Sequence, residues 1–420
     1  MKIRSITAGT QIDVPPDGKR LAHVADFLRA SREACQEAGM EVETVRLATQ
    51  PITESVPSGS PAGALALAQQ LQDHCERLGI EYCTLGPVLA DRSEASLSLV
   101  EAIPKIIQKT TTIFAAVLVA SRQRGINLRA IDATARAIKG VSQTSQDGFG
   151  NLRLAALANC PPHSPFFPAA YHAGAEDAFS VALESADLAV EAFTGAHTLE
   201  EARDELRRRV EEAANSIERL LAGIGTAHDV KFLGTDLSLA PFPSDDRSIA
   251  TAVERLGVSN FGASGTLFVS ALIADVLRKA KVKKCGFSGL MYPLLEDSAM
   301  ARRAAQESYT LDSLLLYSAV CGTGLDTIPL PGEISTVQLG AILLDVAALA
   351  TVLDKPLTAR LLPIPGKRAG EMTNFSFPYF ANARILDVGG TGAAALLSKG
   401  DFIGFSPLHR PPATELTRPD

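Results

Sequence analysis

Acidic side chains stand inside several apolar segments of this sequence, where an unpaired carboxylate is energetically costly. Asp236 interrupts the strand-like run KFLGTDLSLAPFP at 231–243. Because side chains alternate between the two faces of a strand, Asp236 and Ser238 share one face. A buried carboxylate needs hydrogen bonds, a cation or a metal ion. Asp236 is therefore a candidate for proton transfer and Ser238 for substrate binding, the alternative being an acid satisfied by backbone N–H groups.

The segment VCGTGLDTIPLPGE at 320–333 places a thiol and a carboxylate on a glycine- and proline-rich loop. Glycine permits positive φ and close approach of a ligand to the backbone, so Gly322 and Gly324 are candidate substrate contacts. Cys321 is either a small buried residue or a reactive, catalytic thiol. The loop lacks the lysine of a P-loop, and no GxGxxG follows a strand, so no nucleotide cofactor is predicted.

Two further loops carry groups suited to binding or acid–base chemistry. In IPGKRAGEM at 364–372, Lys367 and Arg368 follow a strand, at the kind of position where open α/β sheets bind ligands. They are candidates for holding an anionic substrate, and a solvated turn is the alternative. His172, in the Pro- and Gly-rich segment 163–179, is a candidate general base or ligand. A purely structural histidine is its alternative.

The acids of the second half of the chain suggest a site for a hard cation. Oxygen ligands bind calcium or magnesium, and the chain lacks the His and Cys spacing of a zinc site. If these acids converge, the sequence predicts a Ca²⁺ or Mg²⁺ site. Asp297 alternatively complements a helix dipole at a helix start, and Asp345 alternatively lies on a narrow solvent-facing seam. The candidate metal ligands are Glu296, Asp297, Asp326, Asp345 and Glu371.

Composition restricts the class of protein. The chain has 420 residues, of which 46% are hydrophobic and 21% charged, as in a folded globular protein. The net charge of -7 argues against a nucleic-acid partner. The six cysteines show no CxxC spacing, which argues against a disulfide scaffold. We find no apolar run of the ~18 residues that a membrane span needs and no signal peptide, so we expect a cytoplasmic protein, with a homodimer as the base-rate expectation.

Apolar strand-like runs alternate with helical patterns along the chain, which favours an α/β sheet or barrel. Strands are expected near 2–8, 43–48, 112–120, 152–160, 228–243, 357–366 and 383–388. Helices are expected near 60–79, 96–110, 128–142, 198–222, 265–281 and 335–353. We expect one domain over 1–405, with a subdivision near 195–227 where the composition becomes strongly charged, and a C-terminal surface arm over 406–420.

Several of these segments resemble the family called domain of unknown function 711. They include SPFFPAAYHAG at 164–174, LGTDLSLAPFP at 233–243, CGTGLDTIPLPG at 321–332 and RLLPIPGKRAGEM at 360–372. The resemblance implies a ten-stranded α/β barrel with helices outside, like that of pyruvate formate-lyase and other glycyl-radical enzymes. In those enzymes a loop cysteine becomes a radical, and Cys321 is the matching residue. However, LDVGGTG at 386–392 does not match the glycyl-radical signature. Small ACT-type regulatory proteins accompany family members.

The sequence leads to one main hypothesis and two alternatives. The main hypothesis is an enzyme that acts on a small anionic metabolite at an acid-lined barrel site. It would carry out lyase, aldolase or isomerase chemistry with a divalent cation and without a redox cofactor. The first alternative is a metabolite-binding regulator that signals to a partner. The second is thiyl-radical chemistry through Cys321.

Overall fold

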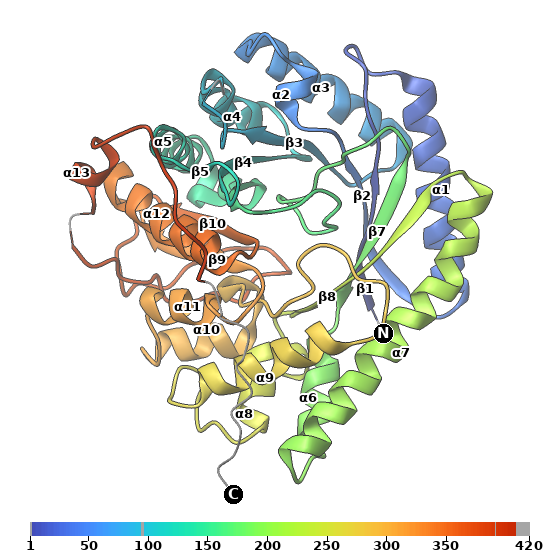
Figure 1. Ribbon diagram of the computed structural model, residues 1–420, viewed down its shortest axis with the longest axis vertical. Coiled ribbons are helices and arrows are strands. Elements are labelled where there is room, and N and C mark those ends of the chain that lie inside the picture. The colour runs from blue at the N-terminus through green and yellow to red at the C-terminus, as the bar shows by residue number, and fades with distance from the viewer. Residues whose placement is uncertain (1, 94–95, 391, 409–420) are drawn as a thin grey trace, which may run out of the picture.

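The computed structural model describes residues 2–93, 96–390 and 392–408, which form a mixed α/β fold (Figure 1). A single eleven-stranded sheet lies at its centre. The strands are β1 (Lys2–Gly9), β2 (Glu41–Ala48), β3 (Tyr82–Leu89), β4 (Ile113–Ser121), β5 (Gly125–Asn127), β6 (Leu154–Ala158), β7 (Ala178–Glu184), β8 (Lys231–Ala240), β9 (Gly324–Pro331), β10 (Leu357–Ile364) and β11 (Phe402–Ile403).

The helices are arranged around the outside of this sheet (Figure 1). The α-helices are α1 (Gly18–Glu37), α2 (Ile52–Ser55), α3 (Pro61–Leu78), α4 (Ser98–Lys109), α5 (Leu128–Thr144), α6 (Ala186–Thr194), α7 (Leu199–Ala227), α8 (Ile249–Arg255), α9 (Thr266–Lys279), α10 (Ser298–Ala305), α11 (Leu311–Ser318), α12 (Thr336–Leu353) and α13 (Ala394–Leu397). Three 3₁₀ turns accompany them, namely η1 (Gln146–Arg153), η2 (Asp245–Arg247) and η3 (Leu294–Glu296).

Local sequence signals explain where these elements begin and end. The Ser60 side chain accepts a hydrogen bond from the Gly63 N–H at the start of α3, and Gly79 ends that helix in the left-handed conformation. A capping box between Ser335 and Gln338 starts α12. Every residue of β4 is buried, as expected for a parallel strand covered on both faces.

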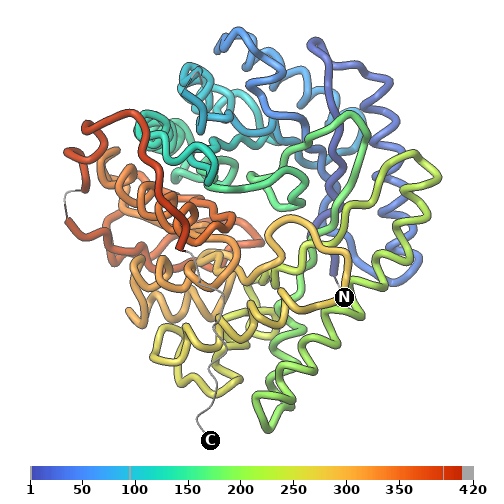
Figure 2. Tube along the Cα trace, viewed as in Figure 1, coloured from blue at the N-terminus to red at the C-terminus, as the bar shows by residue number. Residues whose placement is uncertain are grey.

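The sheet consists of two parallel groups of strands that run in opposite directions. The first group is β1-β2-β3-β4-β6. The second group consists of two parallel pairs, β7–β8 and β9–β10. Antiparallel pairs β1–β7 and β6–β10 join the groups. Figure 2 shows this path: the chain rounds one side of the molecule, crosses back to β7 beside β1, and then rounds the other side.

The sheet is open between its edge strands β8 and β9, so the expected closed ten-stranded barrel is not shown. The segment between the edges makes one isolated bridge to each. Thr235 of β8 pairs with Lys284, and Pro293 pairs with Asp326 of β9. The chain from Lys284 to Pro293 therefore spans the gap without forming a regular strand there. The coarser expectation of an α/β fold with outer helices is confirmed.

Helix α12 differs from the expectation that no apolar run reaches the length of a membrane span. Its 18 residues, Thr336–Leu353, have a mean hydropathy of 1.9, which matches a membrane span by length and composition. However, α12 packs against α5, β6 and β10, and its Leu339, Leu343 and Val346 are buried. One face of α12 is therefore packed in the core, and 44% of its residues are buried.

The two predicted boundaries are the subdivision near 195–227 and the start of the C-terminal arm at 406. Most of the charged stretch 195–227 is the single helix α7, which contacts α1, α6, α9 and β8. Its Arg208 and Glu212 form an ion pair on the exposed face of the helix. Part of the predicted surface arm, residues 409–420, lies outside the described residues.

Gly86 of β3 packs closely against the backbone of the segment that follows β2. It has φ +66°, and a Cβ atom there would lie 2.3 Å from the Gln50 carbonyl oxygen. Gly39, after α1, has φ +75° and nothing within 4 Å of a built Cβ. Both alanine variants incur left-handed strain, and only Gly86→Ala adds overpacking. In urea unfolding, we expect Gly86→Ala to be less stable than Gly39→Ala by about 2 kcal/mol. Equal losses of stability in the two variants would show that the backbone readily relieves the contact between the added Cβ and the Gln50 carbonyl oxygen.

Candidate functional site

A central cavity is lined by charged side chains from strands on both sides of the sheet opening. Its volume is about 80 Å³. Arginines and carboxylates line it alongside aromatic rings. The charged residues are Arg4 of β1, Glu43 and Arg46 of β2, Glu296 of η3, Asp326 of β9 and Arg360 of β10. The aromatic residues are Tyr82, Phe114, Phe166, Phe167, Phe287, Phe377 and Tyr379.

A chain of ion pairs runs across the interior from β1 to β9. Arg4 pairs with Glu296 through Nη2. Arg360 donates from Nη2 to Glu296 Oε1 at 2.7 Å and from Nε to Asp326 Oδ1 at 2.5 Å. Buried charges are stable only when they are paired in this way. The network therefore fixes the positions of four strands or turns around the cavity.

The pKa values of the two network carboxyl groups move in opposite directions. Burial opposes ionisation of Glu296, but Arg4, Arg360 and Arg46 together hold its pKa below the ordinary value. Burial raises the pKa of Asp326, and the charge of Glu296 adds to that rise against the effect of Arg360. Glu296 is thus kept ionised while Asp326 is the group that holds a proton more readily. Such a split is typical of acid and base pairs in catalytic sites.

Arg46 is the cavity cation that has no carboxylate partner among the described residues. Its side chain is 7% exposed, and its one hydrogen bond runs from Nε to Thr44 Oγ1 at 2.8 Å. The guanidinium carbon lies 5.6 Å from the Tyr82 ring centroid and 5.3 Å from that of Phe167. Burial and the neighbouring Arg4 lower the pKa of Arg46 to about 10. A buried guanidinium with unused donors is suited to bind an anion.

Comparison with known proteins places the chain in a family. Residues 1–378 match the family model described as "Uncharacterised ACR (DUF711)". The chain belongs to the DUF711 family. It is 32% identical to a UPF0210 protein of Pyrobaculum aerophilum over 390 residues, covering 89% of this chain and 86% of the relative.

A second archaeal relative gives a similar result. The DUF711 protein is 31% identical to a UPF0210 protein of Methanopyrus kandleri over 402 residues, covering 88% of each chain. The family resemblance inferred from the sequence is therefore confirmed. No comparison supports the further relationship to glycyl-radical enzymes.

Asp236 and Ser238 of this DUF711 protein lie outside the cavity lining and hold a loop in place. The Asp236 carboxylate is fully buried. Its Oδ1 accepts from Ser238 N and Oγ and from Ser288 N, and its Oδ2 accepts from Phe287 N at 2.7 Å. The Ser238 hydroxyl also accepts from Gly289 N. The pair thus satisfies backbone donors of segment 287–289, which is the alternative that the sequence left open.

The remaining predicted catalytic residues also lie away from the cavity lining. His172 is buried, donates from Nε2 to the Gly174 carbonyl oxygen at 2.8 Å, and packs against the His163 ring in an edge-on arrangement. Burial lowers its pKa. Cys321 is 1% exposed and lines a separate pocket with Cys285. Neither group is placed to act on a ligand held by Arg46.

The predicted glycine and cation contacts have structural explanations. Gly322 packs against Gly289, since a Cβ on Gly322 would lie 2.5 Å from the Gly289 Cα. Gly324 has φ +92°, and its Cβ would meet the Thr358 carbonyl oxygen of β10. Lys367 and Arg368 lie on the loop after β10, and the Arg368 N–H donates to Glu371. This loop does not line the cavity.

The five predicted metal ligands do not converge. Only Glu296 and Asp326 line the cavity, and Arg360 bridges them. Asp297 caps α10 by accepting from Met300 N, Asp345 lies on the exposed side of α12, and Glu371 is exposed on its loop. Within the described part of the chain, no group of three or more His, Cys, Asp or Glu residues is arranged to hold a metal.

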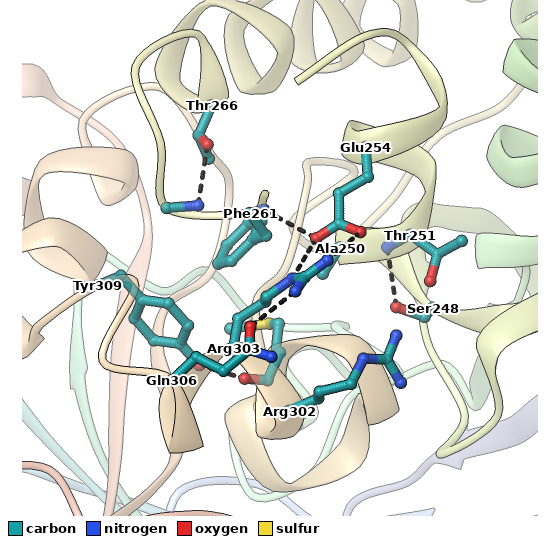
Figure 3. A network of polar contacts seen from close by, with 12 residues as sticks. Ser248, Ala250, Thr251, Glu254, Phe261, Thr266, Arg302, Arg303, Gln306 and Tyr309 are labelled. Atoms are coloured by element: carbon teal, nitrogen blue, oxygen red, sulfur yellow. Dashed lines mark hydrogen bonds and ion pairs between the residues drawn. The ribbon is translucent and has the colours of Figure 1, made fainter. Parts of the chain in front are cut away.

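Polar contacts around Asp297 fix the turn that carries Glu296. Asp297 Oδ2 accepts from Ile249 N at 2.7 Å, which ties α10 to α8. Figure 3 shows the adjoining network, in which Arg303 of α10 donates to both carboxylate oxygens of Glu254 of α8. The anchored helices hold the end of η3 in place. Glu296 is therefore presented to the cavity from a rigid support.

Sequence reasoning missed Arg4, Arg46 and Arg360, although each was visible as a charge in a strand-like run. RLA at 46–48 and ARLLPI at 359–364 belong to runs that read as buried strands. A cation in such a run needs a partner, just as an acid does. Applying the test of unpaired charge to arginines as well as acids would have identified all three, since Arg4 lies in the expected strand 2–8.

Replacing Asp236 separates a structural role from a catalytic one. Asp236→Asn replaces one accepting oxygen with an NH₂ group that faces backbone N–H donors. We expect a loss of about 3 kcal/mol in the free energy of unfolding, measured with urea. Asp345→Asn, on the exposed side of α12, is the control and should change stability little. Unchanged stability in Asp236→Asn would refute the structural role.

The raised pKa of Asp326 predicts a specific pH dependence of stability. The folded-state pKa lies above the ordinary value of 3.8, so the folded protein binds this proton more tightly than the unfolded chain does. The stabilisation is complete below pH 3.8 and is lost as pH rises through the folded pKa. We therefore compare the free energy of unfolding of the native protein with that of Asp326→Asn. The native protein's value, relative to the variant's, should fall as the pH rises through this range. A difference that rises with pH would contradict the shift.

Proposed function

We propose that this DUF711 protein is an enzyme that acts on a small anionic metabolite bound in the central cavity by Arg46. The observation that carries the proposal is the buried guanidinium of Arg46, which has no carboxylate partner among the described residues. Leaving a cation unpaired in a buried site is costly, so a site that keeps one is suited to an anionic ligand. A carboxylate or phosphate oxygen pair fits the planar fork of a guanidinium.

The size of the cavity restricts the ligand. Its volume of about 80 Å³ is smaller than the ~150 Å³ apolar cavity that accommodates benzene. It therefore suits a molecule of a few heavy atoms or the reacting end of a longer one. The aromatic residues Phe114, Phe167 and Phe377 add apolar surface to its lining. Low water content strengthens each charge interaction with the bound anion.

Asp326 is the residue that we assign to proton transfer. It lies against Arg360, which fixes its orientation through Oδ1, and its raised pKa means that it holds a proton more readily than an ordinary aspartate does. Glu296, kept ionised by three arginines, balances their charge. With Arg46 holding the anionic group, Asp326 moves a proton on a neighbouring atom of the substrate. This is the chemistry of a lyase or isomerase that uses no redox cofactor.

A divalent cation was also expected from the sequence. Of the five expected ligands, only Glu296 and Asp326 line the cavity, and both already pair with arginine. This set does not fit the predicted Ca²⁺ or Mg²⁺ site, so we derive no step through a metal. Cys321 lines a different pocket, so the cavity also offers no support for the thiyl-radical alternative.

A metabolite-binding regulator is the second candidate, because a ligand held by Arg46 need not react. The ion pairs of Arg4 and Arg360 connect the cavity to β1, β9 and β10, so a ligand that perturbs them alters several strands at once. A small regulatory protein is the partner that this alternative implies. The two candidates differ in whether the ligand is recovered chemically changed.

Binding of a panel of small anions tests the role of Arg46. Calorimetric titration uses pyruvate, lactate, glycolate, malonate and inorganic phosphate with the full chain. We expect at least one to bind and Arg46→Met to weaken that binding by about 10-fold to 100-fold, the loss typical of a charged hydrogen bond. Arg136→Met, at an exposed ion pair on α5, is the control. Equal binding by Arg46→Met and the native protein would refute the proposal.

Hydrogen–deuterium exchange at carbon tests turnover. In D₂O, the enzyme hypothesis predicts that the bound anion exchanges a carbon-bound hydrogen, observed by proton NMR. Asp326→Asn should stop this exchange while the ligand still binds. Binding without exchange or conversion of any anion in the panel would favour the regulator.

A further inference from the structure

Two residues that line the same cavity as Arg46 each carry a buried oxygen atom with no hydrogen-bond partner among the described residues. One is Oε2 of Glu43 on β2, and the other is Oγ1 of Thr323, just before β9. Both atoms are buried, and both residues line the same cavity as Arg46. Buried polar groups almost always have a partner, so unpaired ones that line a cavity point to a ligand.

The formal charges of the cavity side chains show what kind of ligand would complete it. Arg4, Arg360, Glu296 and Asp326 are joined to one another by ion pairs. Arg46 and Glu43 remain, with opposite charges, and no ion pair within 4.0 Å joins either to another described residue. They are close enough for the charge of Glu43 to act on Arg46. The site therefore leaves one cation and one anion open.

A purely anionic ligand would leave this arrangement incomplete. It would pair with Arg46 but bring a second negative charge towards Glu43, which already lacks a hydrogen bond at Oε2. A ligand that carries both charges satisfies both residues at once. Like charges brought together in a poorly solvated site oppose binding, whereas opposite charges favour it.

We infer that the natural ligand is a short zwitterion, with an ammonium group on the same small molecule as the anionic group. Arg46 binds the anionic group, and Glu43 accepts hydrogen bonds from the ammonium at Oε2. The Thr323 hydroxyl accepts a further ammonium hydrogen from the β9 side. This inference rests on the proposed function, because it assumes that Arg46 holds the anion.

The aromatic residues near Glu43 are consistent with an ammonium group at this end. Tyr379 lies within electrostatic range of Glu43, and Tyr82 and Phe377 also line the cavity. Aromatic faces attract ammonium cations. The small volume excludes a long chain between the two charged groups. The small cavity therefore favours a short spacer between the ammonium and the anionic group.

Matched pairs of ligands that differ only in the ammonium group test this inference. Calorimetry compares glycine with glycolate and L-alanine with L-lactate, using the full chain. In each pair a hydroxyl replaces the ammonium at almost unchanged size. We expect the native protein to bind the zwitterion at least ten times more tightly than the hydroxy acid in at least one pair.

Glu43→Gln, which keeps the size of the side chain and removes its charge, assigns the preference to Glu43. We expect it to reduce the ammonium preference at least tenfold and to bind the hydroxy acid as tightly as before or more tightly. Thr323→Val should weaken binding of the zwitterion. It should lower the melting temperature less than a core substitution does. A preference that is unchanged in Glu43→Gln would overturn the assignment of the ammonium subsite.

The outcomes distinguish this inference from the proposed function. If anions bind through Arg46 but glycolate and lactate bind as tightly as glycine and alanine, the zwitterion inference is wrong and the anion site stands. If binding of every probe is absent or unaffected by Arg46→Met, both are wrong. If Glu43→Gln melts at the same temperature as the native protein, a difference in ligand affinity between the two reflects binding and not a loss of folded structure.

Discussion

The pairing of buried charges is the constraint on which this structure most depends. Arg360 reaches both Glu296 and Asp326, and Arg4 meets Glu296 from the opposite side. These residues come from β1, η3, β9 and β10, so the network connects strands that the open sheet does not join directly. Removing one member would leave a charge buried without its partner, which is far more costly than replacing a surface ion pair.

The same constraint explains why one end of the interior is suited to chemistry. Arg4 and Arg360 each have a carboxylate partner. Arg46 and Glu43 differ because their side chains lie in the same low-dielectric environment without an ion pair among the described residues. Such groups interact strongly with whatever enters the cavity, because little water is present to screen them. Preorganised but incomplete electrostatics of this kind is a common basis of selective binding and catalysis.

Local sequence signals predicted much of the fold but little of the site. The helix expected at 60–79 is α3, Pro61–Leu78, because its Ser60 cap and Gly79 terminator act over a few residues. The nearly all-apolar run at 112–120 likewise forms β4. Asp236, in contrast, resembled a catalytic acid because its partners Phe287 and Ser288 lie more than fifty residues along the chain. The strand arginines were missed for the same reason, since long-range pairing decides which buried charge is satisfied.

The order of the strands also affects how this interior can be assembled during synthesis. Arg4 belongs to the first group of strands, whereas its partner Glu296, and Arg360 of β10, are synthesised only after the chain has crossed back to β7. A ribosome-bound chain that ends before residue 296 carries Arg4 without its counter-charge. Domains generally fold as units as they emerge. The charge of Arg4, on the first strand, is therefore neutralised within this network only after more than half of the chain has been synthesised.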